Sequence, residues 1–148
     1  MKMLVLGAGL QGSACAYDLL QNPSITEVRL ADKTVDHLPA FLEPYVGGER
    51  LKLITIDVKD PAAVQAAMAG VKSVMCAIPY YFHLPMSEAA IAAGAHFCDL
   101  GGNTEIVENQ KKLDAKAAAA GVTVIPDCGL APGMVNILAQ LGIDRLDT

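Results

Sequence analysis

The sequence has 148 residues, of which 53% are hydrophobic and 18% charged, and its formal net charge is -5. The apolar share exceeds the roughly 45–50% of average proteins, so one domain with a large buried core is expected and disorder is not. Lys and Arg gather in no stretch, which makes binding to nucleic acid or to an anionic membrane unexpected. No apolar run reaches the about 18 residues that a membrane-spanning helix needs.

The cysteines favour a reducing compartment over a disulfide framework. They form no C-x-x-C pair and show no metal-binding spacing with histidine, so no metal site is expected. The four are Cys15, Cys76, Cys98 and Cys128. We interpret the last three, which lie near the ends of predicted strands, as small buried hydrophobes, with a reactive thiol as the alternative for Cys128. Residues 1–6 lack the layout of a signal peptide, which also favours a cytoplasmic location.

The first part of the chain alternates strand and helix patterns. A strand is predicted at 2–6, where residues 3–6 form a continuous apolar run that is typical of a central parallel strand buried on both faces. A helix is predicted at 10–21, because Pro23 prevents its continuation, and a second strand at 28–31. A helix or a loop follows at 35–45, where Pro and Gly residues disfavour a single long helix.

The middle of the chain continues this alternation, with strands predicted at 51–56 and 71–78. Between them Asp60 is a predicted N-cap, Pro61 suits a first helical position and Gly70 suits the C-terminal stop.

A helix then runs to about residue 93, with Pro85 in its first turn or before its start, and a fifth strand covers 95–100. Asn103 or Thr104 caps a long helix that ends at Gly121. One face of that helix carries Ile106, Gln110, Leu113 and Ala117, with Gln110 as the polar exception.

The last predicted elements are a sixth strand at 122–126 and a helix at about 134–141. Six strands separated by helix-length segments call for a parallel sheet with right-handed crossovers. We therefore predict an α/β, doubly wound sheet of the Rossmann type with strand order 3-2-1-4-5-6. A ligand is expected where the strand order reverses, at the carboxyl ends of strands one and four.

A complete G-x-G-x-x-G motif joins the first strand to the first helix, and this context makes it a strong dinucleotide signal. Its residues are Gly7, Ala8, Gly9, Leu10, Gln11 and Gly12. Gly7 allows the tight turn, Gly9 lets a pyrophosphate approach the backbone, and Gly12 lets the helix pack closely on the strand. The helix N-terminus then faces the phosphate charge.

Asp32 ends the second predicted strand, where a carboxylate accepts hydrogen bonds from the adenosine ribose and repels a 2′-phosphate. This predicts NAD rather than NADP, although the ammonium of Lys33 partly offsets the carboxylate. The alternatives are a plain turn residue for Asp32 and a flavin as the dinucleotide.

Other residues at the strand ends are expected to line the same site. Asp57 follows the third strand and either flanks the adenine pocket or is a solvated strand-end carboxylate. Ala77, Ile78 and Pro79 end the fourth strand, and their backbone is expected beside the nicotinamide ribose.

Three motifs give the sequence a resemblance to the saccharopine dehydrogenase family, and most to its lysine 6-dehydrogenase branch. They are GAGLQG at 7–12, DLGGN at 99–103 and DCGLAPGM at 127–134, together with Asp32 and Asp57. The resemblance implies an NAD(P)-dependent oxidoreductase that acts on the C–N bond of an amino acid such as lysine or saccharopine.

The resemblance also implies a substrate domain after the cofactor domain. We therefore expect residues 1–148 to be the dinucleotide-binding domain of a longer two-domain enzyme, inactive by itself, with the substrate domain absent from this chain. The hydrophobic excess favours self-association, so a homo-oligomer is expected, with a small-molecule amino-acid substrate as the other partner.

A proton acceptor for the substrate amine would assist hydride transfer. The candidates near the crevice are Tyr81, His83 and Asp127. The first two are alternatively a helix start with a surface imidazole, and Asp127 alternatively stabilises its loop. Asp99, which precedes two glycines, is interpreted as a backbone-capping carboxylate rather than a base.

A second function class remains open, because regulatory NAD-sensing Rossmann domains are also acidic single domains of about this length. A ligase domain that binds a nucleotide or coenzyme A is a third, which Asp32 disfavours. The DCGLAPGM motif has no evident purpose in a sensor, and this favours the dehydrogenase.

Overall fold

A computed structural model describes residues 1–146 and shows one six-stranded parallel sheet in the order β3-β2-β1-β4-β5-β6. The strands are β1 (Lys2–Leu6), β2 (Glu27–Asp32), β3 (Leu51–Thr55), β4 (Ser73–Cys76), β5 (His96–Asp99) and β6 (Val124–Ile125). The predicted strand order and the reversal between β1 and β4 are confirmed.

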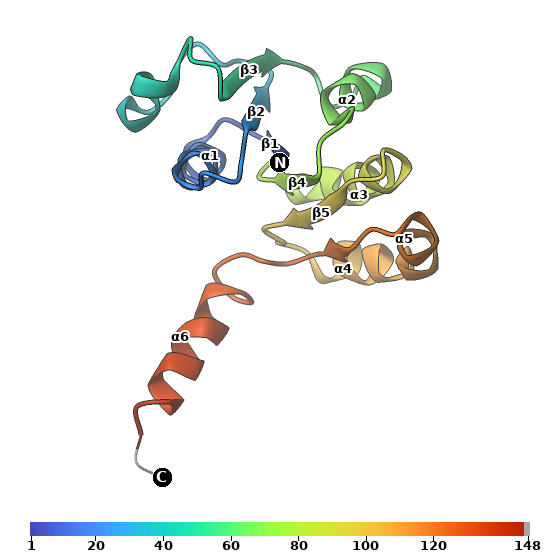
Figure 1. Ribbon diagram of the computed structural model, residues 1–148. Helices are drawn as coiled ribbons and strands as arrows, with labels where there is room; N and C mark the ends of the chain where they lie inside the picture. Colours follow the sequence, from blue (N-terminus) through green and yellow to red (C-terminus); the bar gives the residue numbers. More distant parts are fainter. Residues whose placement is uncertain (147–148) are drawn as a thin grey trace.

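Helices cover both faces of the sheet. They are α1 (Leu10–Gln21), the 3-10 helix η1 (Ala40–Tyr45), α2 (Pro61–Met68), the 3-10 helix η2 (Tyr80–Phe82), α3 (His83–Ala92), α4 (Thr104–Lys111), α5 (Asp114–Ala120) and α6 (Met134–Ile143). In Figure 1 the sheet is seen nearly edge-on, with α1 and η1 on one side and α2 to α5 on the other. This arrangement is the doubly wound architecture that the alternating sequence predicts.

The central strand β1 divides the interior into two cores, because successive side chains of a strand point to opposite faces. Leu4 and Leu6 pack with residues of α2 and α3, whereas Val5 packs with α1 and η1. All three are fully buried. A strand buried on both faces has no polar alternation, which explains the continuous apolar run at this point of the sequence.

Two helix caps are confirmed. The Asp60 carboxylate accepts hydrogen bonds from the first amides of α2, and Asn103 Oδ1 accepts from Ile106 N at 3.1 Å. The prediction of one long helix after Asn103 was wrong. A tight turn at Lys112 and Leu113 separates α4 from α5, and there Leu113 N donates to Gln110 O at 2.9 Å.

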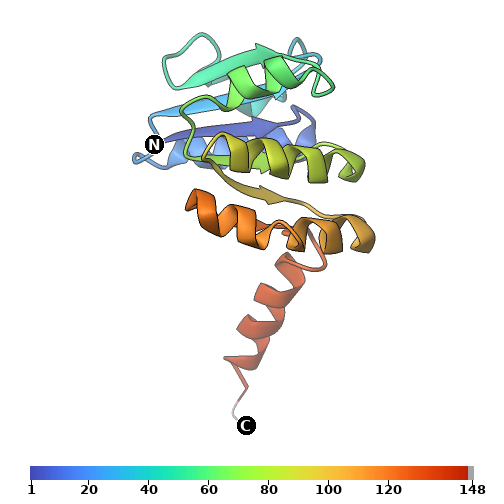
Figure 2. The same cartoon turned by 90° about the vertical axis from the view of Figure 1, so that its right-hand side faces the viewer.

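Helix α6 extends away from the sheet, as both views show (Figures 1 and 2). Its residues are exposed, including the large apolar side chains of Ile137, Leu138 and Leu141. Among residues 1–146 no helix combines the length and the apolar character needed to cross a membrane.

Candidate dinucleotide site at the strand ends

The glycine-rich turn fits closely against the neighbouring backbone because Gly7 and Gly12 have no side chains. A Cβ on Gly12 would lie 1.8 Å from Gly7 O, and a Cβ on Gly7 would lie 2.6 Å from Ala77 O. Gly7 also adopts a positive φ of 101°. Around Gly9, by contrast, nothing lies within 4 Å of an added Cβ, so the backbone there is open to a ligand. The roles expected for Gly7 and Gly12 match this geometry, whereas the approach of a pyrophosphate to Gly9 stays a prediction.

The start of α1 has neither a capping side chain nor an acidic side chain to compensate its unpaired amide groups. Gly9 is the N-cap, so it provides no side-chain hydrogen bond, and the first turn contains no acidic residue. The first amide groups of a helix have no partner within the helix, and the helix dipole places partial positive charge there. An approaching phosphate therefore meets unpaired N–H groups over an open backbone.

Asp32 is joined directly to this turn. Its Oδ2 accepts a hydrogen bond from Ala8 N, and its Oδ1 accepts from Lys33 N, each at 2.6 Å. Each carboxylate oxygen has two lone pairs, so both can still accept hydrogen bonds from a ligand. The two amide contacts fix the orientation of the carboxylate beside the glycine-rich turn.

A cleft of about 450 Å³ opens beside Asp32, and we call it the Asp32 cleft. Its lining comes from the carboxyl ends of β1 to β4 and from the segment after β4. The lining residues are Gly7, Gly9, Ala31, Asp32, Lys33, Ile56, Val58, Lys59, Ala77, Ile78, Pro79, Tyr81 and Phe82. Its volume and partly apolar lining suit a small-molecule ligand.

Asp57 lies at the edge of this cleft and is not part of its lining. Its Oδ2 forms an exposed ion pair with Lys33 Nζ at 3.1 Å. The backbone amide of Lys59, followed by the Lys33 ammonium, lowers the pKa of the Asp57 carboxyl. Its expected role beside an adenine therefore stays a prediction, whereas its contact with Lys33 is a property of the fold.

Tyr81 lines the Asp32 cleft together with Val58 and Lys59. The same cleft is lined by Ile78 and Pro79, whose backbone is expected beside the nicotinamide ribose. Its expected role as a proton acceptor therefore stays a prediction.

His83 is buried, with only 1% of its surface exposed. Its Nε2 lies 2.9 Å from Ile78 O, and its Nδ1 lies 3.2 Å from Asp99 Oδ1. Neither ring nitrogen is free to contact a substrate. This geometry opposes the expectation that His83 accepts a proton from a substrate amine and makes the alternative of a surface imidazole wrong.

Asp99 is fully buried and caps backbone amides, as its position before two glycines predicted. Its Oδ1 accepts hydrogen bonds from Gly101 N at 2.8 Å and from Asp127 N at 3.0 Å. Burial acts to raise the pKa of Asp99. The hydrogen bonds from His83, from the Asp127 amide and from Gln110 outweigh burial, so the net pKa is lowered.

A second hollow, of about 520 Å³, lies on the other side of the glycine-rich turn, and we call it the Asp127 hollow. It is lined by Gln11, Leu100, Gly102, Asp127, Cys128, Gly129, Leu130, Ala131 and Met134. Asp127 is half-buried and has a positive φ of 66°, which is uncommon for a residue other than glycine. A Cβ on Gly101 would meet the Asp127 carboxylate, so this glycine leaves room for it.

The thiols at this end of the sheet are not activated. Burial, followed by the nearby Asp99 and Asp127 carboxylates, raises the pKa of Cys128, which therefore disfavours the reactive thiolate considered for it. Cys128 is nevertheless exposed, so its interpretation as a buried hydrophobe was wrong. Cys76 is buried as expected, and Cys15 and Cys98 are half-buried.

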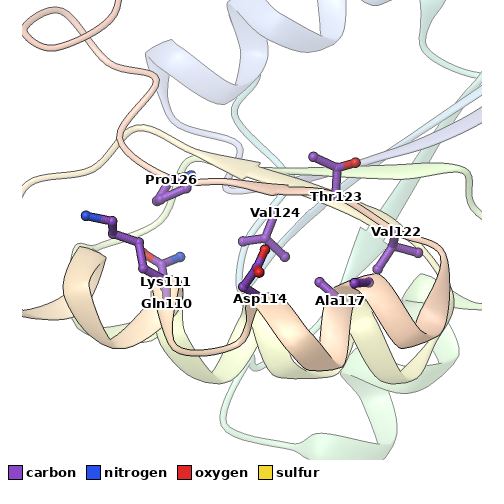
Figure 3. Close-up of a pocket in the computed structure, with 9 residues that line it drawn as sticks. Gln110, Lys111, Asp114, Ala117, Val122, Thr123, Val124 and Pro126 are labelled. Carbon is purple, nitrogen blue, oxygen red and sulfur yellow. The ribbon is translucent and has the colours of Figure 1, made fainter.

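A third groove, of about 490 Å³, lies between β6 and the helices α4 and α5. Figure 3 shows Asp114 and Ala117 facing Val124 across it, with Lys111 toward Pro126. No residue of the glycine-rich turn lines this groove, so it lies outside the dinucleotide site.

Sequence reasoning missed two features of the site, the contribution of Lys59 to the Asp32 cleft and the contacts of Gln110. Gln110 Nε2 donates to Asp99 Oδ2 at 2.6 Å and to Ser87 Oγ at 2.7 Å. The polar exception on an apolar helix face was a signal for a buried partner, but the sequence does not identify Asp99 as that partner.

Comparison with known proteins agrees with this arrangement. Residues 3–125 match the family model described as the saccharopine dehydrogenase NADP binding domain. A saccharopine dehydrogenase [NADP(+), L-glutamate-forming] of Saccharomyces cerevisiae is 28% identical over 97% of the chain, and the match covers 30% of that relative. The mitochondrial alpha-aminoadipic semialdehyde synthase of Bos taurus is 26% identical over 97% of the chain and 15% of its own length. The chain thus spans less than a third of the length of these relatives.

A solved structure gives the same result. The apo saccharopine dehydrogenase (L-Glu forming) from Saccharomyces cerevisiae has a TM-score of 0.76 and 28% identity, over 97% of this chain and 31% of that one. The match to the family model extends from β1 to β6 and includes the glycine-rich turn, Asp32 and Asp99. The chain therefore belongs to the saccharopine dehydrogenase family, whose nucleotide-binding domain it matches.

Proposed function

We propose that this chain binds NAD as the cofactor domain of an oxidoreductase that acts on the C–N bond of an amino acid of the lysine or saccharopine type. The observation that carries the proposal is the uncapped start of α1 beside the Asp32 carboxylate. Family membership supports a nicotinamide dinucleotide and amino-acid chemistry.

The residues of the chain would act mainly by positioning the dinucleotide. The amides at the start of α1 would receive the pyrophosphate, and Asp32 would accept hydrogen bonds from the adenosine ribose hydroxyls. The backbone at Ile78 and Pro79 would border the rest of the dinucleotide. When bound, the nicotinamide ring supplies the hydride acceptor.

Asp127 is the candidate for substrate contact that the geometry leaves open. Its side chain lines the Asp127 hollow beside Gln11 of the glycine-rich turn. A carboxylate there would attract the ammonium of an amino-acid substrate and accept a hydrogen bond from it. Its amide is held by Asp99, so the position of its backbone is fixed.

The proposal favours NAD over NADP on electrostatic grounds. A 2′-phosphate carries a charge of about −2 and would lie next to the Asp32 carboxylate. The Lys33 ammonium is already paired with Asp57. NADP is the second candidate, because Lys59 lines the Asp32 cleft and the family model and the yeast relative are named for NADP.

Titration of the chain with NADH and with NADPH, followed by nicotinamide fluorescence, tests this proposal. We expect NADH to bind at least about tenfold more tightly, since a hydrogen bond to a charged group contributes about 1.5–3 kcal/mol. Asp32→Ser should weaken NADH binding and reduce the preference. The control Asp18→Ser changes an exposed carboxylate of α1 and should leave both affinities unchanged.

Equal or tighter binding of NADPH by the unchanged chain would contradict the NAD assignment, and no binding of either would contradict the cofactor role. A reduction assay on the full-length gene product, with a panel of amino acids that includes lysine and saccharopine, tests the catalytic half. Dinucleotide binding without NADH formation on any amine would favour the regulatory NAD-sensing domain.

A further inference from the structure

The hydrogen bonds around Asp99 determine its charge. Oδ1 accepts from two backbone amides and lies next to His83 Nδ1, and Oδ2 accepts from Gln110 Nε2. In this orientation Gln110 Nε2 also donates to Ser87 Oγ at 2.7 Å, and Gln110 Oε1 is buried without a hydrogen-bond partner among the described residues. A proton on either oxygen would face a donor, so Asp99 is a carboxylate.

The same reasoning determines the charge of His83. Its Nδ1 faces a carboxylate oxygen and its Nε2 faces the carbonyl oxygen of Ile78, and neither of these groups has a proton to donate. A neutral imidazole has only one N–H. In one of the two contacts, a nitrogen lone pair would therefore face an oxygen lone pair with no hydrogen between them. The doubly protonated ring gives each of the two contacts a donor.

This ion pair connects the two sides of the glycine-rich turn. Through Nε2, His83 holds the carbonyl of Ile78, which lines the Asp32 cleft. Through Asp99 it holds the amides of Gly101 and Asp127, and Asp127 lines the Asp127 hollow. Three strand-end segments, after β4, β5 and β6, therefore meet at one buried pair.

We propose that His83 is a buried imidazolium that acts as a positioning residue, because its pair with Asp99 fixes the Asp32 cleft and the Asp127 hollow relative to each other. The proposal deepens the proposed function, since it concerns the same dinucleotide site. Loss of the His83 proton would release one of the two contacts and loosen the site.

The other titratable side chains around the pair do not replace His83 in this role. Burial raises the pKa values of Cys76 and Cys98 to about 12, and that of Cys128 is raised too. These thiols stay neutral near neutral pH. The Asp127 carboxyl is the remaining acidic group, and as a carboxylate it favours a cation nearby.

The protonation of His83 is measured directly by long-range 1H–15N NMR of the imidazole rings. At about pH 7 we expect two protonated nitrogens at His83. His96 is an internal control, because its Nδ1 accepts a hydrogen bond from Thr123 N at 3.0 Å and must therefore be unprotonated. A spectrum with one bare nitrogen at His83 would overturn the proposal.

Two variants separate the contacts of the ring. Asparagine at position 83 keeps a donor near Asp99, and glutamine keeps one near the Ile78 carbonyl. We expect His83→Asn and His83→Gln each to raise the Kd for NADH about tenfold, which lies in the usual range of coupling between sites. His96→Asn should leave this Kd unchanged.

An unchanged Kd in folded variants would overturn the positioning role. If the unchanged chain binds neither NADH nor NADPH, the proposed function fails, and amide chemical shifts of His83→Asn decide the inference. Changes in the amide chemical shifts of both Ile78 and Asp127, relative to the unchanged chain, would support it. Changes confined to α3 would refute it.

Discussion

The two sides of the glycine-rich turn use charge in opposite ways. On one side, Lys33 and Asp57 form an ion pair whose side chains are 60% and 45% exposed. On the other side, His83 and Asp99 are 2% and 0% exposed. Exposed pairs are screened by water and contribute little to stability, whereas a buried charge must keep its partner. The first side therefore has charges available to a ligand, and the second uses its charges to hold the structure.

The contrast between the exposed and the buried ion pair predicts that the largest effect on stability occurs at Asp99. Asp99→Asn removes the carboxylate and leaves the His83 cation buried without a partner, so the free energy of unfolding should fall by about 3–5 kcal/mol. Urea denaturation followed by circular dichroism measures this. The matched control is Asp60→Asn, which keeps an N-cap side chain at the exposed start of α2 and should change stability little. Equal effects of the two substitutions would break the distinction between the two sides.

The next largest effect is expected at the turn itself. Gly12→Ala places a Cβ against Gly7 O, so the backbone must shift, at a cost of about 1–3 kcal/mol. NADH affinity should fall together with stability, because the displaced turn is the one that receives the phosphates. Gly142→Ala is the control, since nothing lies within 4 Å of an added Cβ in α6. A Gly12→Ala protein with normal stability and affinity would show that the close contact is not required.

Acid should destabilise the protein through Asp99. The pKa of Asp99 in the folded protein lies below its ordinary value of 3.8, so its stabilisation is present above that value. It is lost as the pH falls through the lowered pKa. Urea midpoints measured between about pH 6 and about pH 3 should therefore decrease, and Asp99→Asn should flatten the dependence. The same slope in both proteins would assign the acid sensitivity to other carboxyls.

The smallest effect is expected at the exposed pair. Lys33→Met removes the partner of Asp57 without changing the unfolding midpoint measurably. It should instead alter dinucleotide preference, since Lys33 lines the Asp32 cleft and a cation there offsets the Asp32 carboxylate. A clear loss of stability would mean that this side is also structural and would weaken the comparison.

The side of the site that contains the Asp32 cleft could be predicted well from the sequence. The glycine spacing and an acidic residue at the end of β2 form a short-range pattern, and the apolar periodicity predicted the strand order. The second side depends on the packing of side chains from three different elements. His83, Asp99 and Gln110 lie far apart in the chain, and nothing in their spacing indicates that they meet. The turn that divides α4 from α5 was missed for a similar reason, since an Ala-rich run without Pro or Gly predicts a continuous helix.

The contact between Gly7 and Ala77 has a consequence for how the site comes into existence. A peptide that contained only β1, the glycine-rich turn and α1 would carry the whole motif but lack the wall provided by the end of β4. Nucleotide recognition is therefore a property of the assembled sheet rather than of the motif. During synthesis the turn has to await the arrival of β4, and a bound dinucleotide would then favour the completed sheet over every shorter intermediate.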